Sequence, residues 1–253
     1  MARRREQQLS QSNVPPLMFN STGGPVLGIV GLTGGAGATQ LTYLIASIAS
    51  AHSEAPVLAM DTGGPCAALD YFAGVASSLS LIRASNQVAS NHTPVDPGLI
   101  VGSPFGARIL SAGNEPDDVE WDPDAVARLV DFACAAHGLT VVDCGHLDRE
   151  IEHQVLASCT HVAWLIPATA QGVAMAVRSL SNQRRSLDAR EVLIARFVEE
   201  AERVVMSELS RAATARNMDL ILMPHITDPQ GQDPRLLEDQ LGAVIEALVG
   251  LLR

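Results

Sequence analysis

The chain contains no lysine: all 17 of its basic residues are arginine. Acidic residues number 28, so the formal net charge is −11. This balance disfavours broad attraction to nucleic acid or to an anionic membrane surface, and it leaves room only for a local basic patch. A phosphate contact that usually involves lysine must therefore use arginine, backbone N–H groups or a partner molecule.

Aromatic residues, long apolar runs and patterned cysteines are also scarce. Aromatics make up 4% of the 253 residues, whereas 47% are hydrophobic, so small aliphatic side chains must build the core. No apolar run is long enough to span a bilayer, and residues 6–13 are polar where a signal peptide would be apolar. The four cysteines lack metal-ligand spacing and are interpreted as free thiols. We expect a cytoplasmic protein.

Short β-branched segments alternate with helical segments along most of the chain. This order predicts an α/β fold with a doubly wound, mainly parallel sheet and helices on both faces. Residues 1–24 are predicted to form a flexible tail, and residues 25–253 a single domain. Strands are expected at 26–32, 56–60, 108–110, 139–143, 161–166, 192–195 and 220–223, and helices at 41–50, 69–72, 79–83, 122–136, 170–180, 199–216 and 234–252.

A glycine-rich turn, Thr-Gly-Gly-Ala-Gly-Ala-Thr at residues 33–39, joins the first predicted strand to the first helix. Such a turn directs backbone N–H groups at one point, and the helix N-terminus adds positive potential, so it is suited to bind phosphate. A standard phosphate loop adds a lysine for the phosphates and a hydroxyl for Mg²⁺. Here Ala38 takes the lysine position and Thr39 the hydroxyl position. Asp61 and Asp143 end two other strands at the same edge of the predicted sheet.

Three segments, in this order, resemble motifs of the MinD/ParA ATPases. Residues 33–39 resemble their deviant phosphate loop, in the Gly-Ala-Thr variant typical of the CpaE/TadZ branch and of septum-site-determining (Ssd-like) proteins of actinobacteria. Residues 57–65, continuing to Leu69-Asp70, resemble the motif at the second strand of that branch. Residues 141–145, Val-Val-Asp-Cys-Gly, resemble the Walker B strand.

The resemblance implies a site for ATP and Mg²⁺ around the glycine turn. The residues expected to contact the nucleotide are Gly34, Gly35, Ala36, Gly37, Ala38, Thr39 and Gln40. If a nucleotide binds, Thr39, Asp61 and Asp143 are expected to hold the magnesium, and the two aspartates are the only candidates for a catalytic role.

The sequence departs from the family at several positions of the site, although it keeps the glycines, Thr39, Asp61 and Asp143. Thr33 replaces the signature lysine, Ala38 replaces the phosphate-binding lysine, and Gly63 stands where an aspartate would orient the attacking water. Ala195-Arg196 falls where many relatives carry an Asn-Arg pair that reads adenine. Because the loss of one electrostatic contact typically costs about 10²–10³ in rate, the sequence predicts no ATPase activity or a very weak one.

With these departures, the resemblance implies a degenerate, dimerising ATPase that acts as a positioning or scaffold factor. The resemblance implies a protein partner in a polar, pilus/secretion or septum-associated complex, and recruitment to the pole, the septum or the inner membrane face. Two alternatives stay open: an active ATP-dependent switch whose missing cation comes from another subunit, and a ParA-like DNA partition protein. Residues 178–216 hold eight arginines and six acids, a small excess that disfavours DNA. The last helix carries an apolar stripe together with acids, so it is expected to pack against the sheet and to make at most peripheral membrane contact.

Overall fold

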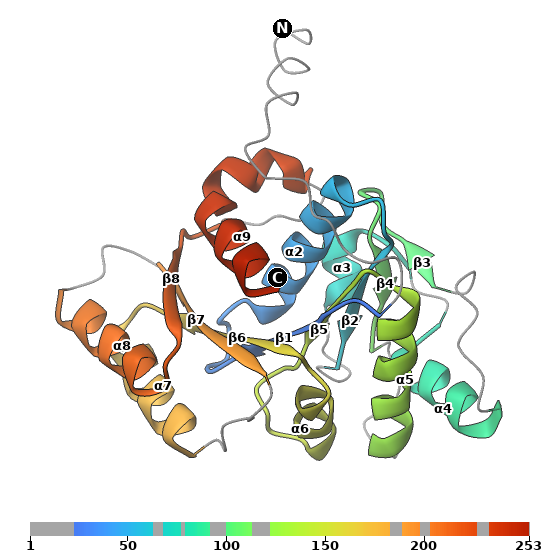
Figure 1. Ribbon diagram of the computed structural model, residues 1–253, viewed down its shortest axis with the longest axis horizontal. Helices are drawn as coiled ribbons and strands as arrows, with labels where there is room; N and C mark the ends of the chain where they lie inside the picture. Colours follow the sequence, from blue (N-terminus) through green and yellow to red (C-terminus); the bar gives the residue numbers. More distant parts are fainter. Residues whose placement is uncertain are drawn as a thin grey trace, which may run out of the picture.

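The computed structural model describes residues 23–62, 68–76, 79–91, 100–112, 122–182, 189–197, 203–226 and 233–252 (Figure 1). Within these residues, eight strands form one sheet in the order β3-β4-β2-β5-β1-β6-β7-β8. All neighbouring strands are parallel except β3 and β4. The strands are β1 (Val26–Gly31), β2 (Val57–Asp61), β3 (Val101–Gly102), β4 (Arg108–Leu110), β5 (Leu139–Asp143), β6 (His161–Pro167), β7 (Arg190–Arg196) and β8 (Asp219–Met223).

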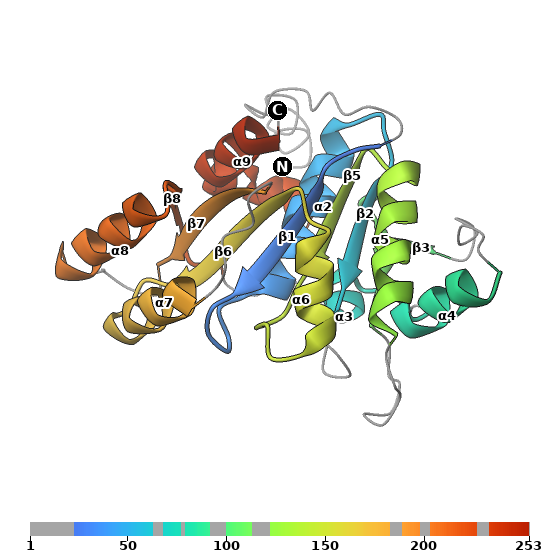
Figure 2. The same cartoon turned by 60° about the horizontal axis from the view of Figure 1, so that its bottom comes forward.

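Helices cover both faces of the sheet, which confirms the predicted doubly wound architecture (Figure 2). Helices α2, α3 and α9 pack with η2 on one face, and α4, α5, α6, α7 and α8 pack on the other. The helices are α2 (Ala38–His52), α3 (Leu69–Ala73), α4 (Leu81–Asn91), α5 (Pro123–Ala136), α6 (Glu150–Ala157), α7 (Ala170–Asn182), α8 (Arg203–Ala215) and α9 (Glu238–Leu252), with the 3₁₀ turn η2 (Pro234–Leu237).

Alternate residues of each buried strand supply the two cores. Leu27 and Ile29 of β1 face α2 and α9, whereas Val26 and Val30 face the opposite helix layer. This arrangement follows from the period-2 alternation of a strand that is covered on both faces, and it explains why the strands are apolar throughout. Among the described residues, Trp164 of β6 is the largest fully buried side chain. Cys134, Cys144 and Cys159 are free thiols, as predicted, and Cys66 lies outside the described residues.

The main differences from the predicted elements lie at short segments. Helix α6 and the two-residue strand β3 were not expected, and α4 continues to Asn91 beyond the predicted 79–83. Helix α6 is short and its start depends on a capping arrangement between Arg149 and Glu152, which hydrophobic periodicity does not reveal. Gly23 and Gly24, at the end of the predicted tail, donate hydrogen bonds to the carbonyls of Cys134 and His137 at the C-terminal end of α5. Residues 1–22 lie outside the described part of the chain.

The apolar stripe of the last helix packs onto the sheet, as its acidic residues predicted. Its buried members are Leu241, Val244, Ile245 and Leu248, which join the core that also contains α2 and β8. His52 of α2 and the buried Glu238 at the start of α9 approach to 2.8 Å. In the part of the chain that the structure describes, no helix is long and apolar enough to cross a bilayer.

We predict that Leu241→Ala lowers the free energy of unfolding by about 3 kcal/mol, because it removes a fully buried side chain and leaves a cavity. The matched control is Leu236→Ala, since Leu236 is 60% exposed and its truncation should change stability by less than about 0.5 kcal/mol. Urea unfolding curves of both variants provide the measurement. Equal effects of the two substitutions would contradict the packing of α9 against the sheet.

Candidate functional site

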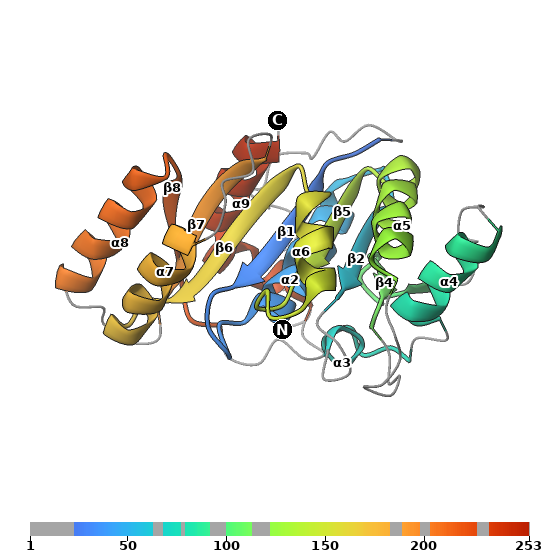
Figure 3. The ribbon, with the colours of Figure 1, turned by 90° about the horizontal axis from the view of Figure 1, so that it is seen from below.

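The glycine turn follows β1 at the centre of the sheet. Strand β1 lies between β5 and β6, and the chain leaves it to reach β2 on one side and later β6 on the other. This is the point where the winding of the sheet reverses direction, and in open α/β sheets ligands bind there, at the carboxyl ends of the strands. The turn lies at that edge, together with the ends of β2 and β5 (Figure 3).

Two glycines adopt the left-handed backbone conformation that the turn requires. Gly35 has φ +72° and Gly37 has φ +97°, and a side chain at either position would be strained. Gly37 also caps the N-terminus of α2, without a side-chain hydrogen bond to the first turn. Leu41 N–H donates to the Gly37 carbonyl and so begins the helical ladder.

The backbone N–H groups of this turn are available to a ligand. The turn is closed by a hydrogen bond from Ala36 N–H to the Thr33 carbonyl, at 3.1 Å. Within the described part of the chain, no acceptor takes the N–H of Gly35, Gly37 or Ala38. Gly34 and Gly35 are exposed, with open space where a side chain would stand. The turn therefore has the donors and the access that an anion needs.

Asp143 and Thr39 lie in direct contact below the turn. The Thr39 hydroxyl donates to Asp143 Oδ2, and Gly145 N–H donates to Asp143 Oδ1 at 3.0 Å. Burial raises the pKa of the Asp143 carboxyl above its ordinary value, and these two hydrogen bonds oppose that shift. Asp61 is also buried and is the register partner of Asp143 on the adjacent strand. The structure thus brings the three predicted metal-ligating residues to one place.

The oxygen donors at this place suit Mg²⁺ in the way that nucleotide sites use it. Magnesium is usually held by one or two carboxylates or hydroxyls together with substrate phosphates and water. Thr39 and Asp143 provide such oxygens beside the open turn, and among the described residues no group of three or more His, Cys, Asp or Glu side chains is arranged to hold a metal alone. The residues therefore fit a magnesium ion that arrives with a phosphate ligand.

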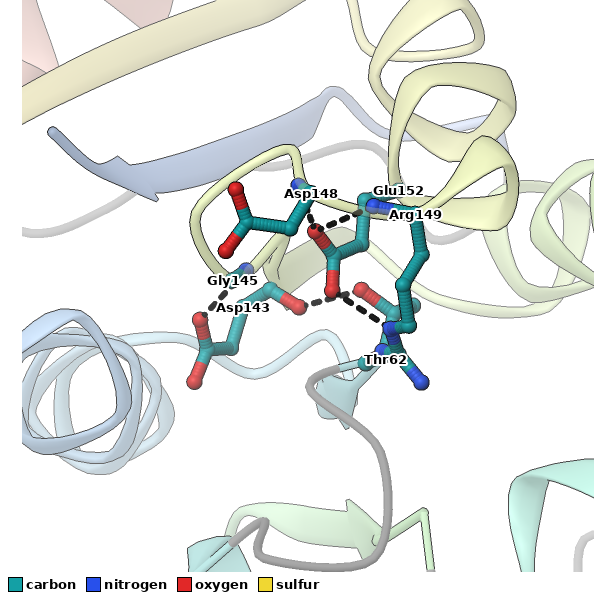
Figure 4. Close-up of polar contacts among 6 residues, drawn as sticks. All are labelled: Thr62, Asp143, Gly145, Asp148, Arg149 and Glu152. Atoms are coloured by element: carbon teal, nitrogen blue, oxygen red, sulfur yellow. Dashed lines mark hydrogen bonds and ion pairs between the residues drawn. The ribbon is translucent and has the colours of Figure 1, made fainter. Parts of the chain in front are cut away.

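An ion pair that the sequence did not reveal lies beside the ends of β2 and β5 (Figure 4). Arg149 Nε contacts Glu152 Oε1 at 2.8 Å, and the same arginine donates through Nη2 to the Thr62 carbonyl. The Thr62 hydroxyl in turn donates to the Asp143 carbonyl at 2.6 Å. These contacts link the end of β2 to the loop after β5 and so hold Asp61 and Asp143 side by side. The only sequence signal is the i, i+3 spacing of an arginine and a glutamate at the start of α6.

Two further side chains reach the turn from distant segments. The side-chain amide of Gln40 donates to the Ile226 carbonyl at 3.3 Å, and the backbone of Gln40 lies in the first turn of α2. Its contact with a nucleotide stays a prediction. Arg196, at the end of β7, donates through Nη2 to the Gly35 carbonyl at 2.9 Å. The replacement of the family's asparagine by Ala195 predicts a loss of adenine recognition at this pair, and the guanidinium of Arg196 lies against the glycine turn. Gly63, where the family has a water-orienting aspartate, lies outside the described residues.

The fold is that of the ParA- and MinD-type P-loop ATPases. A ParA family ATPase from Chlorobium tepidum superimposes with a TM-score of 0.72 and 18% identity, covering 90% of this chain and 98% of that one. A chain of the MinC:MinD cell division protein complex from Aquifex aeolicus gives 0.69 and 16%, covering 89% and 96%. McdA from Cyanothece, in a complex with ATP, gives 0.67 and 16%, covering 91% and 97%. No family model and no curated protein matches the sequence.

Proposed function

We propose that this protein is a nucleotide-binding positioning or scaffold factor with a degenerate ATPase site, of the CpaE/TadZ and Ssd-like branch of the MinD/ParA superfamily. One observation carries the proposal: the glycine turn, Thr39 and Asp143 keep an arrangement suited to Mg²⁺ and phosphate, while Ala38 replaces the lysine needed for rapid phosphoryl transfer. A site of this kind supports binding better than turnover.

In the proposed site, backbone groups and side chains would bind different parts of the Mg·nucleotide. The free N–H groups of the turn and the N-terminus of α2 would contact the phosphates, and Thr39 and Asp143 would hold the magnesium. When bound, Mg²⁺ would neutralise part of the phosphate charge. The Arg149–Glu152 pair would keep the ends of β2 and β5 fixed while the ligand enters.

Dimerisation is the proposed output of nucleotide binding. The turn and α3 lie at the same edge of the sheet (Figure 2). Tyr71 of α3 is 55% exposed. A second copy that covers this edge would bury both the nucleotide and this aromatic side chain. We propose that the dimer then engages a protein partner of a polar, pilus/secretion or septum-associated machine, on the cytoplasmic side of the membrane.

Sedimentation velocity of the purified chain tests this switch. We expect monomers without nucleotide and with Mg·ADP, and dimers with Mg·ATP. Asp143→Asn is the matched variant: it removes a buried charge while keeping the side-chain shape, so the free protein should fold with unchanged or higher stability and should not respond to Mg·ATP. An identical sedimentation profile of the wild-type chain under all three conditions would refute the switch.

The alternative of an active switch with a cation from another subunit makes a different prediction for turnover. It requires rapid ATP hydrolysis that rises with protein concentration as dimers form. The DNA partition alternative rests on the arginines of residues 178–216, of which Arg184 and Arg185 lie outside the described residues. Nothing in the described part of the site favours DNA over a protein partner.

A further inference from the structure

Arg196 is held at the carboxyl edge of the sheet by its backbone. It is the last residue of β7 and the register partner of Pro167 on β6. Its carbonyl accepts a hydrogen bond from Ala168 N–H at 2.8 Å, and the next residue, Phe197, donates to the Met223 carbonyl at 2.9 Å. Backbone hydrogen bonds on both sides therefore fix the position of the Arg196 Cα. The direction in which the side chain leaves the strand follows from that position.

The guanidinium of Arg196 lies across the glycine turn. Nη2 donates to the Gly35 carbonyl, and Nη1 would stand 2.5 Å from a Cβ placed on Gly37. The absence of a side chain at Gly37 is thus what lets the arginine approach the start of α2. The cation reaches the turn from a strand 161 residues away in sequence rather than from the turn itself.

Within the described residues, the charge of Arg196 has no anion to compensate it. Among the described residues no carboxylate pairs with it, and the Gly35 carbonyl is the acceptor that it contacts. Its Nε is shielded from solvent and has no hydrogen-bond partner within the described part of the chain. Burial lowers the pKa of this guanidinium, which reflects the cost of removing a cation from water without pairing it. An anion bound at the turn would remove that cost.

We propose that Arg196 is the cation of this phosphate site, supplied by the same chain in place of the lysine that Ala38 replaces. The planar guanidinium offers several donors in a fixed fork, which suits the oxygens of a di- or triphosphate. Arg196 would contribute its charge to binding the phosphates of the ligand, together with the N–H groups of Gly35, Gly37 and Ala38. This inference rests on the proposed nucleotide site and names the residue that gives it positive charge.

Binding of Mg·ATP and of Mg-tripolyphosphate, which has no base, tests the assignment by isothermal titration calorimetry. We expect Arg196→Gln to weaken both ligands equally, by about 10- to 100-fold, the range for loss of a charged hydrogen bond. Arg196→Lys should recover part of this loss. The matched control is Arg190→Gln, at the opposite end of β7, where the arginine contacts the Leu251 carbonyl; it should leave binding unchanged.

Other results would overturn the assignment. Loss of ATP affinity with unchanged tripolyphosphate affinity would show that Arg196 reads the base, and stronger binding of both ligands by Arg196→Gln would show that the arginine blocks the turn. Unchanged binding of both would remove Arg196 from the site while leaving the proposed nucleotide function intact. A wild-type chain that binds neither ligand would refute the proposed function itself. Circular dichroism melting of each variant checks that it is folded.

Discussion

Saturated with Mg·ATP, the protein should hydrolyse ATP at no more than about a thousandth of the rate of a lysine-containing ParA-type ATPase under the same conditions. The turn carries neither the signature lysine, replaced by Thr33, nor the phosphate-binding lysine, replaced by Ala38. Phosphoryl transfer depends on placed positive charge and an oriented nucleophile, and each lost contact costs about 10²–10³ in rate, although grouped losses do not simply add. The proposed contact of Arg196 would supply positive charge to the phosphates, but a guanidinium has no acceptor with which to orient the attacking water.

Steady-state release of inorganic phosphate measures this rate, over protein concentrations that span the monomer and the dimer. Asp143→Asn serves as the background, because it should remove any turnover that belongs to this site. We expect the two preparations to release phosphate at nearly the same slow rate. Hydrolysis at the rate of active relatives, absent from the Asp143→Asn variant, would replace the scaffold account with the active switch.

Gly37→Val should abolish detectable Mg·ATP binding, with a loss of affinity of at least about 100-fold, or about 2.7 kcal/mol. The backbone at Gly37 has φ +97°, where a β-branched residue is strained, and the new Cβ would stand 2.5 Å from Arg196 Nη1. To relieve this contact, the turn must open or the guanidinium must leave. Either change separates the N–H groups of the turn from the cation that faces them.

The matched control for this variant is Gly102→Val. Gly102 lies in β3, outside the turn; its φ is outside the left-handed region and nothing lies within 4 Å of a Cβ built there. Binding by Gly102→Val should therefore stay within about threefold of wild type, on the ordinary tolerance of exposed positions. Titration calorimetry compares the two variants. Equal losses would show that the effect of Gly37→Val is not specific to the turn, and equal retention would show that the turn does not hold the phosphates.

The sequence was sufficient for those parts of the site that are local in the chain. A strand, a glycine turn and a helix are consecutive, so the position of the turn and of Thr39 follows from composition and spacing. Asp61 and Asp143 could be placed at the same edge because parallel strands end together. The sheet and the packing of α9 were also predictable. The alternation of strands with helices and the apolar stripe of α9 can each be recognised in short stretches of sequence.

The parts that escaped prediction depend on contacts between distant segments. The Gln40 side chain reaches Ile226 across 186 residues, and Arg196 reaches Gly35 across 161. Neither contact has a periodic signature, and both arise only when β7 and β8 are added beside β6. The resemblance to a family that uses lysine identifies the charge that the turn lacks. The fold shows that another cation, Arg196, approaches the turn.

The affinity of the wild-type chain for Mg·ATP tests the central claim most directly, because binding without efficient turnover is what the lysine-free turn implies. Isothermal titration calorimetry at millimolar ATP should show saturable, magnesium-dependent heat with about one nucleotide per chain, and a dissociation constant on the order of 10–1,000 μM, as expected for a site with backbone donors and one cation. No heat and no rise in melting temperature at millimolar Mg·ATP would contradict the claim and leave the glycine turn with a structural role alone.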